Sequence, residues 1–214
     1  MPYLMIRLGA ATIATLLLLL PASAATAAPA IEVVPTGLRA TGITPGADAV
    51  WFGMTMDTFN FARRLTRHAA VVRDDDRDGV VLYELPEISR FSLLFVADTA
   101  TGAYAVFRAE GVKAIEHDLR GNQWRSGIEH LDLSTDFAEV LLVRPGEGAW
   151  TMSAVEGGKN DGDRDRNGKF RLKVKDMEPV GTNTAKPQGA ARRDDLIILF
   201  DTRTFATAIR QAGE

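Results

Sequence analysis

A pattern of 17 residues that occurs twice constrains the fold of this chain more than any other feature. Leu93–Ala109 reads LLFVADTATGAYAVFRA, and Leu196–Ala212 reads LIILFDTRTFATAIRQA. Aligned without gaps, the two segments are identical at 7 positions. Each is an apolar run, an Asp-Thr pair and a second apolar run, which predicts a β-hairpin whose turn is stabilised by Asp98 or Asp201. We therefore expect a duplicated unit built of strands, in which these two Asp residues are structural.

An Asp-rich loop lies upstream of each hairpin, and an alternating segment follows it. The loops are Asp74, Asp76, Asp78 and Gly79 in the first copy and Asp163, Asp165, Asn167 and Gly168 in the second. Apolar residues then recur at every second position, at Val81, Tyr83 and Leu85 and at Phe170, Leu172 and Val174. This period predicts a strand with one buried face after each loop.

The order of these features predicts an all-β fold, because short apolar runs separated by Gly, Pro and Asp turns are typical of β-sandwiches. We expect two duplicated sandwich-like units or one pseudo-symmetric sandwich. The expected first unit is 31–115, a polar connector is 116–134, and the second unit is 135–214. The Gly- and Pro-rich segment Met177–Ala191 is expected to be a loop insertion. Thr58–His68 also fits a short helix, the less favoured alternative.

Segment 1–30 is typical of a secretory signal peptide. Its one charged residue is Arg7, Leu8–Leu20 is predominantly apolar, and small residues follow. This apolar stretch is 13 residues long, whereas a membrane-spanning helix needs roughly 20. We expect the segment to be removed, the protein to be periplasmic or extracellular, and no transmembrane segment to remain.

The composition argues against several classes of protein. The chain has no Cys, which excludes disulfides and thiolate metal sites. Without residues 1–30 it has 24 Lys and Arg against 28 Asp and Glu, a net charge of −4, and this disfavours nucleic-acid binding. No Gly-x-Ser-x-Gly, His-Glu-x-x-His or phosphate-loop motif occurs. A carboxylate-based hydrolase stays open, since distant acids can form such a site.

The Asp-rich loops resemble DxDxDG calcium loops. Calcium takes six to eight oxygens, and such a loop offers side chains at positions 1, 3 and 5, a Gly at 6 and a carbonyl at 7. The expected metal ligands are therefore Asp74, Asp76, Asp78 and the carbonyl of Val80 in the first loop, and Asp163, Asp165, Asn167 and the carbonyl of Lys169 in the second.

Position 12 departs from an EF-hand, because Leu85 and Val174 stand where a bidentate Glu is needed. The strand-like flanks also argue against an EF-hand. Further ligands would have to come from Glu84 or Glu87 in the first copy and from Asp161 or Asp176 in the second. The alternative is a pair of metal-free acidic hairpins, since Asp-Gly and Asn-Gly are common turn sequences.

The order of features also resembles an uncharacterised group of exported bacterial proteins. The resemblance is carried by Val50–Gly53, Asp74–Gly79 and Asp98–Val106 in the first copy, and by Val140–Trp150, Gly157–Gly168 and Leu196–Thr204 in the second. It covers most of the chain after residue 30. It implies export and duplication, and no activity.

Three further groups of residues are weaker candidates. His117 and His130 lie among acids in the connector and offer a His/carboxylate metal site as a minor alternative. The basic cluster Arg63, Arg64, Arg67 and His68 is interpreted as a solvated face. Trp51 and Trp150 sit in apolar runs and are expected in the core, whereas Trp124 is expected to be exposed.

These observations favour an exported, non-catalytic binding or envelope-associated module that calcium stabilises, with an extracellular or envelope partner of unknown identity. The rival hypothesis is a secreted hydrolase that uses carboxylates or the connector His residues. A third hypothesis is a structural protein with metal-free acidic turns. The sequence predicts no substrate.

Overall fold

A computed structural model describes residues 28–59, 62–85, 92–110, 116–118, 128–132, 137–155, 158–159, 169–182, 185–202, 205 and 207–210. These residues form strands and one 3-10 turn. The strands of the first half are β1 (Ala30–Val34), β2 (Gly37–Thr41), β3 (Asp48–Phe59), β4 (Ala62–Arg73), β5 (Val80–Glu84), β6 (Leu93–Asp98) and β7 (Tyr104–Arg108). Those of the second half are β8 (Glu116–Asp118), β9 (Ile128–Asp132), β10 (Phe137–Arg144), β11 (Gly148–Val155), β12 (Lys169–Leu172), β13 (Glu178–Pro179), β14 (Leu196–Asp201) and β15 (Thr207–Arg210), with the 3-10 turn η1 (Val174–Asp176) before β13. The predicted all-β fold is confirmed.

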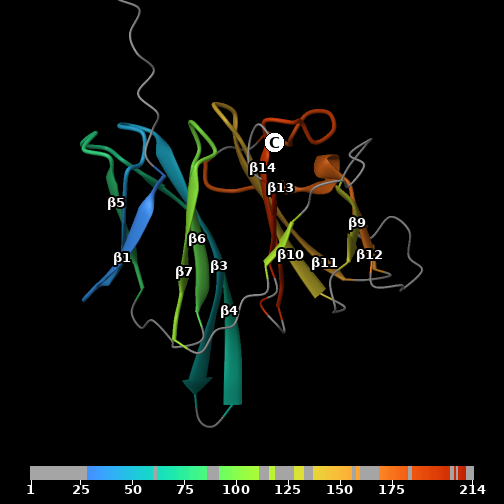
Figure 1. Cartoon of the computed structure of the whole chain (residues 1–214), viewed down its shortest axis with the longest axis horizontal. Coiled ribbons are helices and arrows are strands. Elements are labelled where there is room, and N and C mark those ends of the chain that lie inside the picture. The colour runs from blue at the N-terminus through green and yellow to red at the C-terminus, as the bar shows by residue number, and fades with distance from the viewer. Residues whose placement is uncertain are drawn as a thin grey trace, which may run out of the picture.

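The strands form four sheets that follow one another across the molecule (Figure 1). A three-stranded sheet, β1-β2-β5, covers a four-stranded sheet, β4-β3-β6-β7. A six-stranded sheet, β13-β11-β10-β14-β15-β8, packs on the other side of the four-stranded sheet. The pair β12-β9 covers the far face of the six-stranded sheet.

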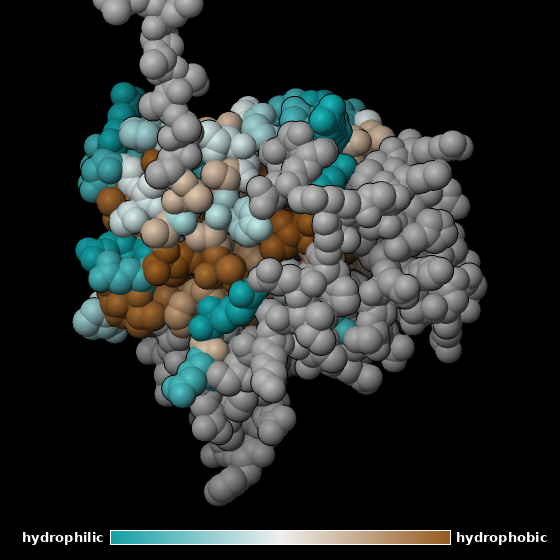
Figure 2. Space-filling model, in the orientation of Figure 1, coloured by the Kyte–Doolittle hydropathy of each residue, from teal (hydrophilic) through white to brown (hydrophobic). Residues whose placement is uncertain are grey.

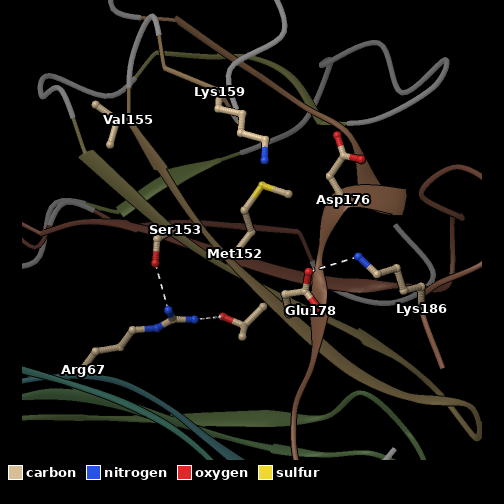
Figure 3. Close-up of a pocket in the computed structure, with 9 residues that line it drawn as sticks. Arg67, Met152, Ser153, Val155, Lys159, Asp176, Glu178 and Lys186 are labelled. Carbon is tan, nitrogen blue, oxygen red and sulfur yellow. Dashed lines mark hydrogen bonds and ion pairs between the residues drawn. The ribbon is translucent and has the colours of Figure 1, made fainter. Parts of the chain in front are cut away.

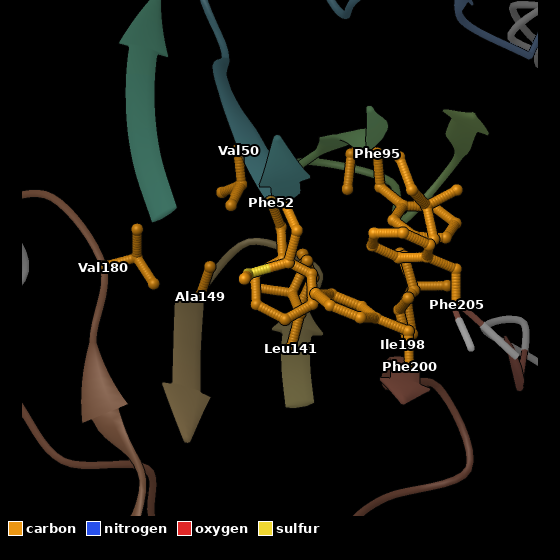
Figure 4. Close-up of a cluster of buried hydrophobic side chains, with 14 residues drawn as sticks. Val50, Phe52, Phe95, Leu141, Ala149, Val180, Ile198, Phe200 and Phe205 are labelled. Atoms are coloured by element: carbon orange, nitrogen blue, oxygen red, sulfur yellow. The ribbon is translucent and has the colours of Figure 1, made fainter. Parts of the chain in front are cut away.

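The two central sheets are buried on both faces, and this explains the unbroken apolar runs of the repeated hairpins. All six residues of β6 and all six of β14 are buried. Phe52 and Phe95 of the four-stranded sheet meet Phe200 of the six-stranded sheet, with ring centroids 5.2 and 6.5 Å apart (Figure 4). One outer core lies between each central sheet and the smaller sheet that covers it. Each half therefore has its own core, and the halves share a third core between them.

The strand order of the central sheets is the same in both halves. The order β4-β3-β6-β7 in the first half corresponds to β11-β10-β14-β15 in the second. Asp98 at the end of β6 faces Ala49 of β3, and Asp201 at the end of β14 faces Ala138 of β10. The strand after each Asp-rich loop pairs with the strand before the long hairpin, as β5 with β2 and β12 with β9.

Two segments differ from the expectations, and one alternative is excluded. The less favoured helix for Thr58–His68 is wrong, because the described residues of this segment belong to β3 and β4, which pair with each other. The expected connector 116–134 contains β8, which pairs with β15, and β9, which pairs with β12. The expected loop insertion Met177–Ala191 contains β13, which extends the six-stranded sheet beside β11.

A buried ion pair holds this inserted segment against the sheet. Arg144 donates to both carboxylate oxygens of Asp195 at 2.8 and 3.0 Å, and neither residue is exposed. The remaining Arg144 donors reach the carbonyls of Gln188 and Ala190 at 2.9 and 3.1 Å. Trp150 donates to the carbonyl of Ala185 at 2.7 Å. These side-chain hydrogen bonds fix the segment in addition to the pairing of β13 with β11.

Replacing Phe200 with Ala tests the shared core. The substitution removes a fully buried ring from the contact between the two central sheets, so we expect the free energy of unfolding to fall by about 3–5 kcal/mol. Urea denaturation should still give one cooperative transition, because both halves contribute to this core. Val33→Ala is the control, since Val33 is 57% exposed and its loss should cost no more than about 0.5 kcal/mol. Two separate transitions in the wild-type protein would contradict the shared core.

Candidate metal centre

The first Asp-rich loop joins β4 to β5 at the end of the molecule where several strand turns gather (Figure 1). In Figure 2 this upper edge is hydrophilic, while hydrophobic residues gather in the middle of the visible face. Two residues of the loop have a left-handed backbone, Arg77 with φ 62° and Gly79 with φ 77°. A Cβ at Gly79 would also lie 2.9 Å from the carbonyl oxygen of Ile43. Both the backbone dihedral angle and the close packing therefore require glycine at position 79.

Asp74 is the organising residue of the loop. It is 1% exposed, and its Oδ2 accepts from the amides of Gly46 and Gly79, both at 2.9 Å. Its Oδ1 accepts from the amide of Asp78 at 3.2 Å. A buried carboxylate needs such donors, because burial without hydrogen bonds is costly for a charge. Oδ2 has two donors and is saturated, whereas Oδ1 keeps a lone pair.

Asp74, Asp76 and Asp78 converge. One carboxylate oxygen from each lies within 4.8 Å of the other two, so the three side chains could hold a metal ion. Asp76 and Asp78 are exposed, and each uses one oxygen for a turn, since Asp76 accepts from the Asp78 amide at 3.4 Å and Asp78 accepts from the Val80 amide at 2.8 Å. Asp76 also shares a side-chain hydrogen bond with Asp74.

The pKa values of Asp74 and Asp76 are shifted in opposite directions. Backbone hydrogen bonds, led by the one from Gly46, lower the pKa of Asp74, although burial of that carboxylate acts in the opposite direction. The hydrogen bond to Asp74 raises the pKa of Asp76, and the charges of Asp78 and Asp74 raise it further. Close carboxylates share a proton when no cation lies between them. A bound cation would take the place of that proton.

Neighbouring loops hold this loop in shape. The amide of Ile43 donates to the carbonyl of Gly79 at 3.1 Å, and the amide of Asp74 donates to the carbonyl of Ala47 at 3.2 Å. Asp98, which is fully buried, accepts from the amide of Thr44 at 3.0 Å and from the amide of Ala100 at 2.8 Å. The structural role predicted for Asp98 agrees with these contacts.

The other predicted ligands have different outcomes. Asp163, Asp165 and Asn167 lie outside the described residues, as do Asp161 and Glu87. Lys169 begins β12, as Val80 begins β5.

Glu84 is too distant to complete the first site. It ends β5 four residues after Val80, roughly 13 Å along the strand. The strands on both sides of the first loop exclude an EF-hand there, as expected. The loops also attach differently, because Asp74 directly follows β4 while Asp163 lies eight residues after β11.

A second polar group, which sequence reasoning missed, joins the two halves. Arg67 of β4 donates to Ser153 Oγ at 2.8 Å and to Thr151 Oγ1 at 2.7 Å, and its Nε lies 3.1 Å from Glu139 Oε2 (Figure 3). Ser153 in turn donates to Glu139 at 2.8 Å. Burial raises the pKa of Glu139, and Arg67 and Ser153 oppose that shift only in part. No local motif signals this group, since it requires β4 of one half to lie over β10 and β11 of the other.

The basic cluster is therefore not a uniform solvated face. Besides the contacts of Arg67, His68 is partly buried between Thr55 Oγ1 and the Tyr83 hydroxyl, both at 2.9 Å. The side chains of Arg63 and Arg64 are outside the described part of the structure.

The connector His residues and the Trp residues complete the comparison with the sequence. His117 and His130 lie on β8 and β9, which belong to different sheets. Trp51 and Trp150 are buried as predicted, at 0% and 3% exposure. Trp124 lies outside the described residues.

Glu139 gives a pH dependence with a defined sign. Its pKa is raised in the folded protein above the ordinary 4.5, so its contribution to stability is complete below pH 4.5 and is lost as the pH rises through the folded pKa. We expect the free energy of unfolding of the wild-type protein, relative to Glu139→Gln, to increase as the pH falls from 7 to 4. Urea titrations at several pH values measure this difference, in which the other carboxylates cancel. A difference that decreases on acidification would show that the pairing with Arg67 outweighs burial.

No described helix has the length and apolar character needed to cross a membrane. Comparisons with known protein families, with curated proteins and with solved structures gave no match. The candidate site is therefore interpreted from its own geometry.

Proposed function

We propose that the protein is an exported, non-catalytic binding or envelope-associated module whose first Asp-rich loop binds calcium. The observation that carries the proposal is the convergence of Asp74, Asp76 and Asp78, whose carboxylate oxygens lie within 4.8 Å of one another. Three acids in a tight turn repel one another unless a cation or a proton lies between them.

The donor set favours a hard cation. The triad offers carboxylate oxygens, which suit calcium and magnesium better than zinc or copper. Calcium tolerates irregular coordination and takes six to eight oxygens, so that water can complete a site on an exposed turn. Magnesium demands near-octahedral geometry and gives up its water reluctantly. Calcium is therefore the ion that we assign to this loop.

Binding of calcium would stabilise the fold rather than serve a reaction. Asp74 links the loop to Gly46, which lies between β2 and β3, so a cation on Asp74 would strengthen the junction of these two loops. A site that forms only in the folded chain adds its binding free energy to folding. The second loop carries the same residue pattern, and we propose a second calcium site there.

Export rests on the sequence of segment 1–30. An exported chain without disulfides depends on its core and on bound ions for stability. A calcium-stabilised loop fits the periplasm or the extracellular medium, where we place the protein.

A secreted hydrolase is the second candidate, favoured by Glu139, Ser153 and Arg67 beside a cavity. Their contacts argue for a structural group, because both Glu139 oxygens accept from Ser153, at 2.8 and 2.9 Å, and Arg67 pairs with the same carboxylate. Glu139 is 8% exposed. A general base must reach the proton that it removes from a substrate, and Glu139 is covered by its own partners.

The thermal response to calcium tests the proposal. Calcium at about 100 times its dissociation constant should add about 2.7 kcal/mol to the free energy of unfolding, or roughly 2–4 °C of melting temperature per kcal/mol for a protein of this size. Asp76→Ala should abolish the increase relative to EDTA. Asp75→Ala is the matched control, because Asp75 is an acid of the same loop outside the triad.

Three outcomes distinguish the hypotheses. A calcium-specific increase that only Asp76→Ala removes supports the site, with magnesium as the ion control. An equal loss in Asp75→Ala would indicate general attraction of cations to an acidic surface. No increase in the wild-type protein would leave the turns metal-free and would refute the proposal.

A further inference from the structure

A cavity of about 640 Å³ lies where the two halves of the molecule meet (Figure 3). Arg67 of β4 forms its wall on the first half, and residues of β11, η1 and β13 form the rest together with Lys159 and Lys186. Its volume is within the range of small-molecule sites in proteins, roughly 300–1,000 Å³. We call it the junction cavity.

The wall that Arg67 forms is rigid. Its guanidinium group is held by the hydroxyls of Thr151 and Ser153 and by the carboxylate of Glu139. A side chain fixed in this way loses little conformational freedom when a ligand binds. The Arg67 side of the junction cavity is thus shaped before any ligand enters it.

The charges of the lining leave one cation and one anion for a ligand. Glu178 is neutralised by Lys186 at 3.0 Å, and the charge of Arg67 is neutralised by Glu139. Lys159 and Asp176 also line the cavity, and within the described ranges neither side chain has an ion-pair partner. Figure 3 shows the Lys159 ammonium and the Asp176 carboxylate near the end of the Met152 side chain, both above it in this view.

This arrangement discriminates among ligand classes. A polyanion would meet the carboxylates of Asp176 and Glu178, and like charges repel. A nucleobase would find no aromatic side chain to stack on in the described lining. Met152 and Val155 supply apolar surface to the lining, and Figure 3 shows Met152 beside the two charged groups and Val155 on the far side of Lys159 from Asp176.

We infer that the junction cavity binds a short peptide with free ends, its carboxylate on Lys159 and its ammonium on Asp176. Charge-assisted hydrogen bonds would fix the two termini, and Met152 would contact the aliphatic part of the peptide. The inference rests on the binding-module part of the proposed function and is independent of calcium.

Titration calorimetry with trialanine tests the inference, using the folded wild-type protein in calcium and in EDTA. We expect saturable binding with a dissociation constant of about 1 mM or tighter. Trialanine amide, which lacks the carboxylate, and N-acetyl-trialanine, which lacks the ammonium, should each bind at least about tenfold more weakly.

Variants assign each terminus to its partner. Lys159→Gln should weaken trialanine at least about tenfold and should remove the preference for trialanine over its amide. Asp176→Asn should also weaken trialanine binding at least about tenfold, and it should remove the preference for trialanine over N-acetyl-trialanine. Lys173→Gln, at an exposed position beside η1, is the control and should change nothing.

Several results would overturn the inference. One is the absence of saturable binding by trialanine, and another is equal binding of N-acetyl-trialanine amide, which is blocked at both ends. A third is unchanged trialanine binding in both variants when circular dichroism shows that they have a native fold. Binding in EDTA with no thermal response to calcium would refute the calcium site alone. A thermal response to calcium without binding of trialanine would refute the peptide site alone.

Discussion

The contact between the two central sheets determines most of this structure. Phe52, Phe95 and Phe200 pack across it, and the opposite faces of both sheets are covered by smaller sheets. A strand buried on both faces has no polar side, which is why β6 and β14 are apolar up to the Asp that ends each of them. The candidate metal centre consequently lies on a turn, while the junction cavity lies where strands of the two halves meet.

The Asp-rich loop shows how a rigid scaffold produces a site on a turn. Asp74 is buried by its contacts with Gly46 and Gly79, which fixes its carboxylate and leaves Asp76 and Asp78 at the surface. Asp98 accepts hydrogen bonds from Thr44 in the adjoining loop, so the repeated hairpin helps to hold that loop in place. Stability and the proposed ion binding depend on the same hydrogen bonds.

Local patterns predicted the features that depend on neighbouring residues. The hairpins, the strand after Gly79 and the convergence of Asp74, Asp76 and Asp78 follow from turn chemistry and from a period of two. Long-range contacts could not be predicted, because Arg67–Glu139 between the halves and Arg144–Asp195 within the second half depend on register and packing between residues 72 and 51 positions apart. Glu84 is close to Asp78 in sequence but lies at the far end of the extended strand β5, roughly 13 Å beyond Val80.

A crystal structure of the protein grown in calcium, with anomalous diffraction data, would test the central claim most directly. The account predicts an anomalous peak coordinated by Asp74 Oδ1 and by one oxygen each of Asp76 and Asp78, at about 2.3–2.6 Å. A loop with the same conformation and only water or an Arg guanidinium between the three carboxylates would contradict it. The carboxylates would then serve the turn alone.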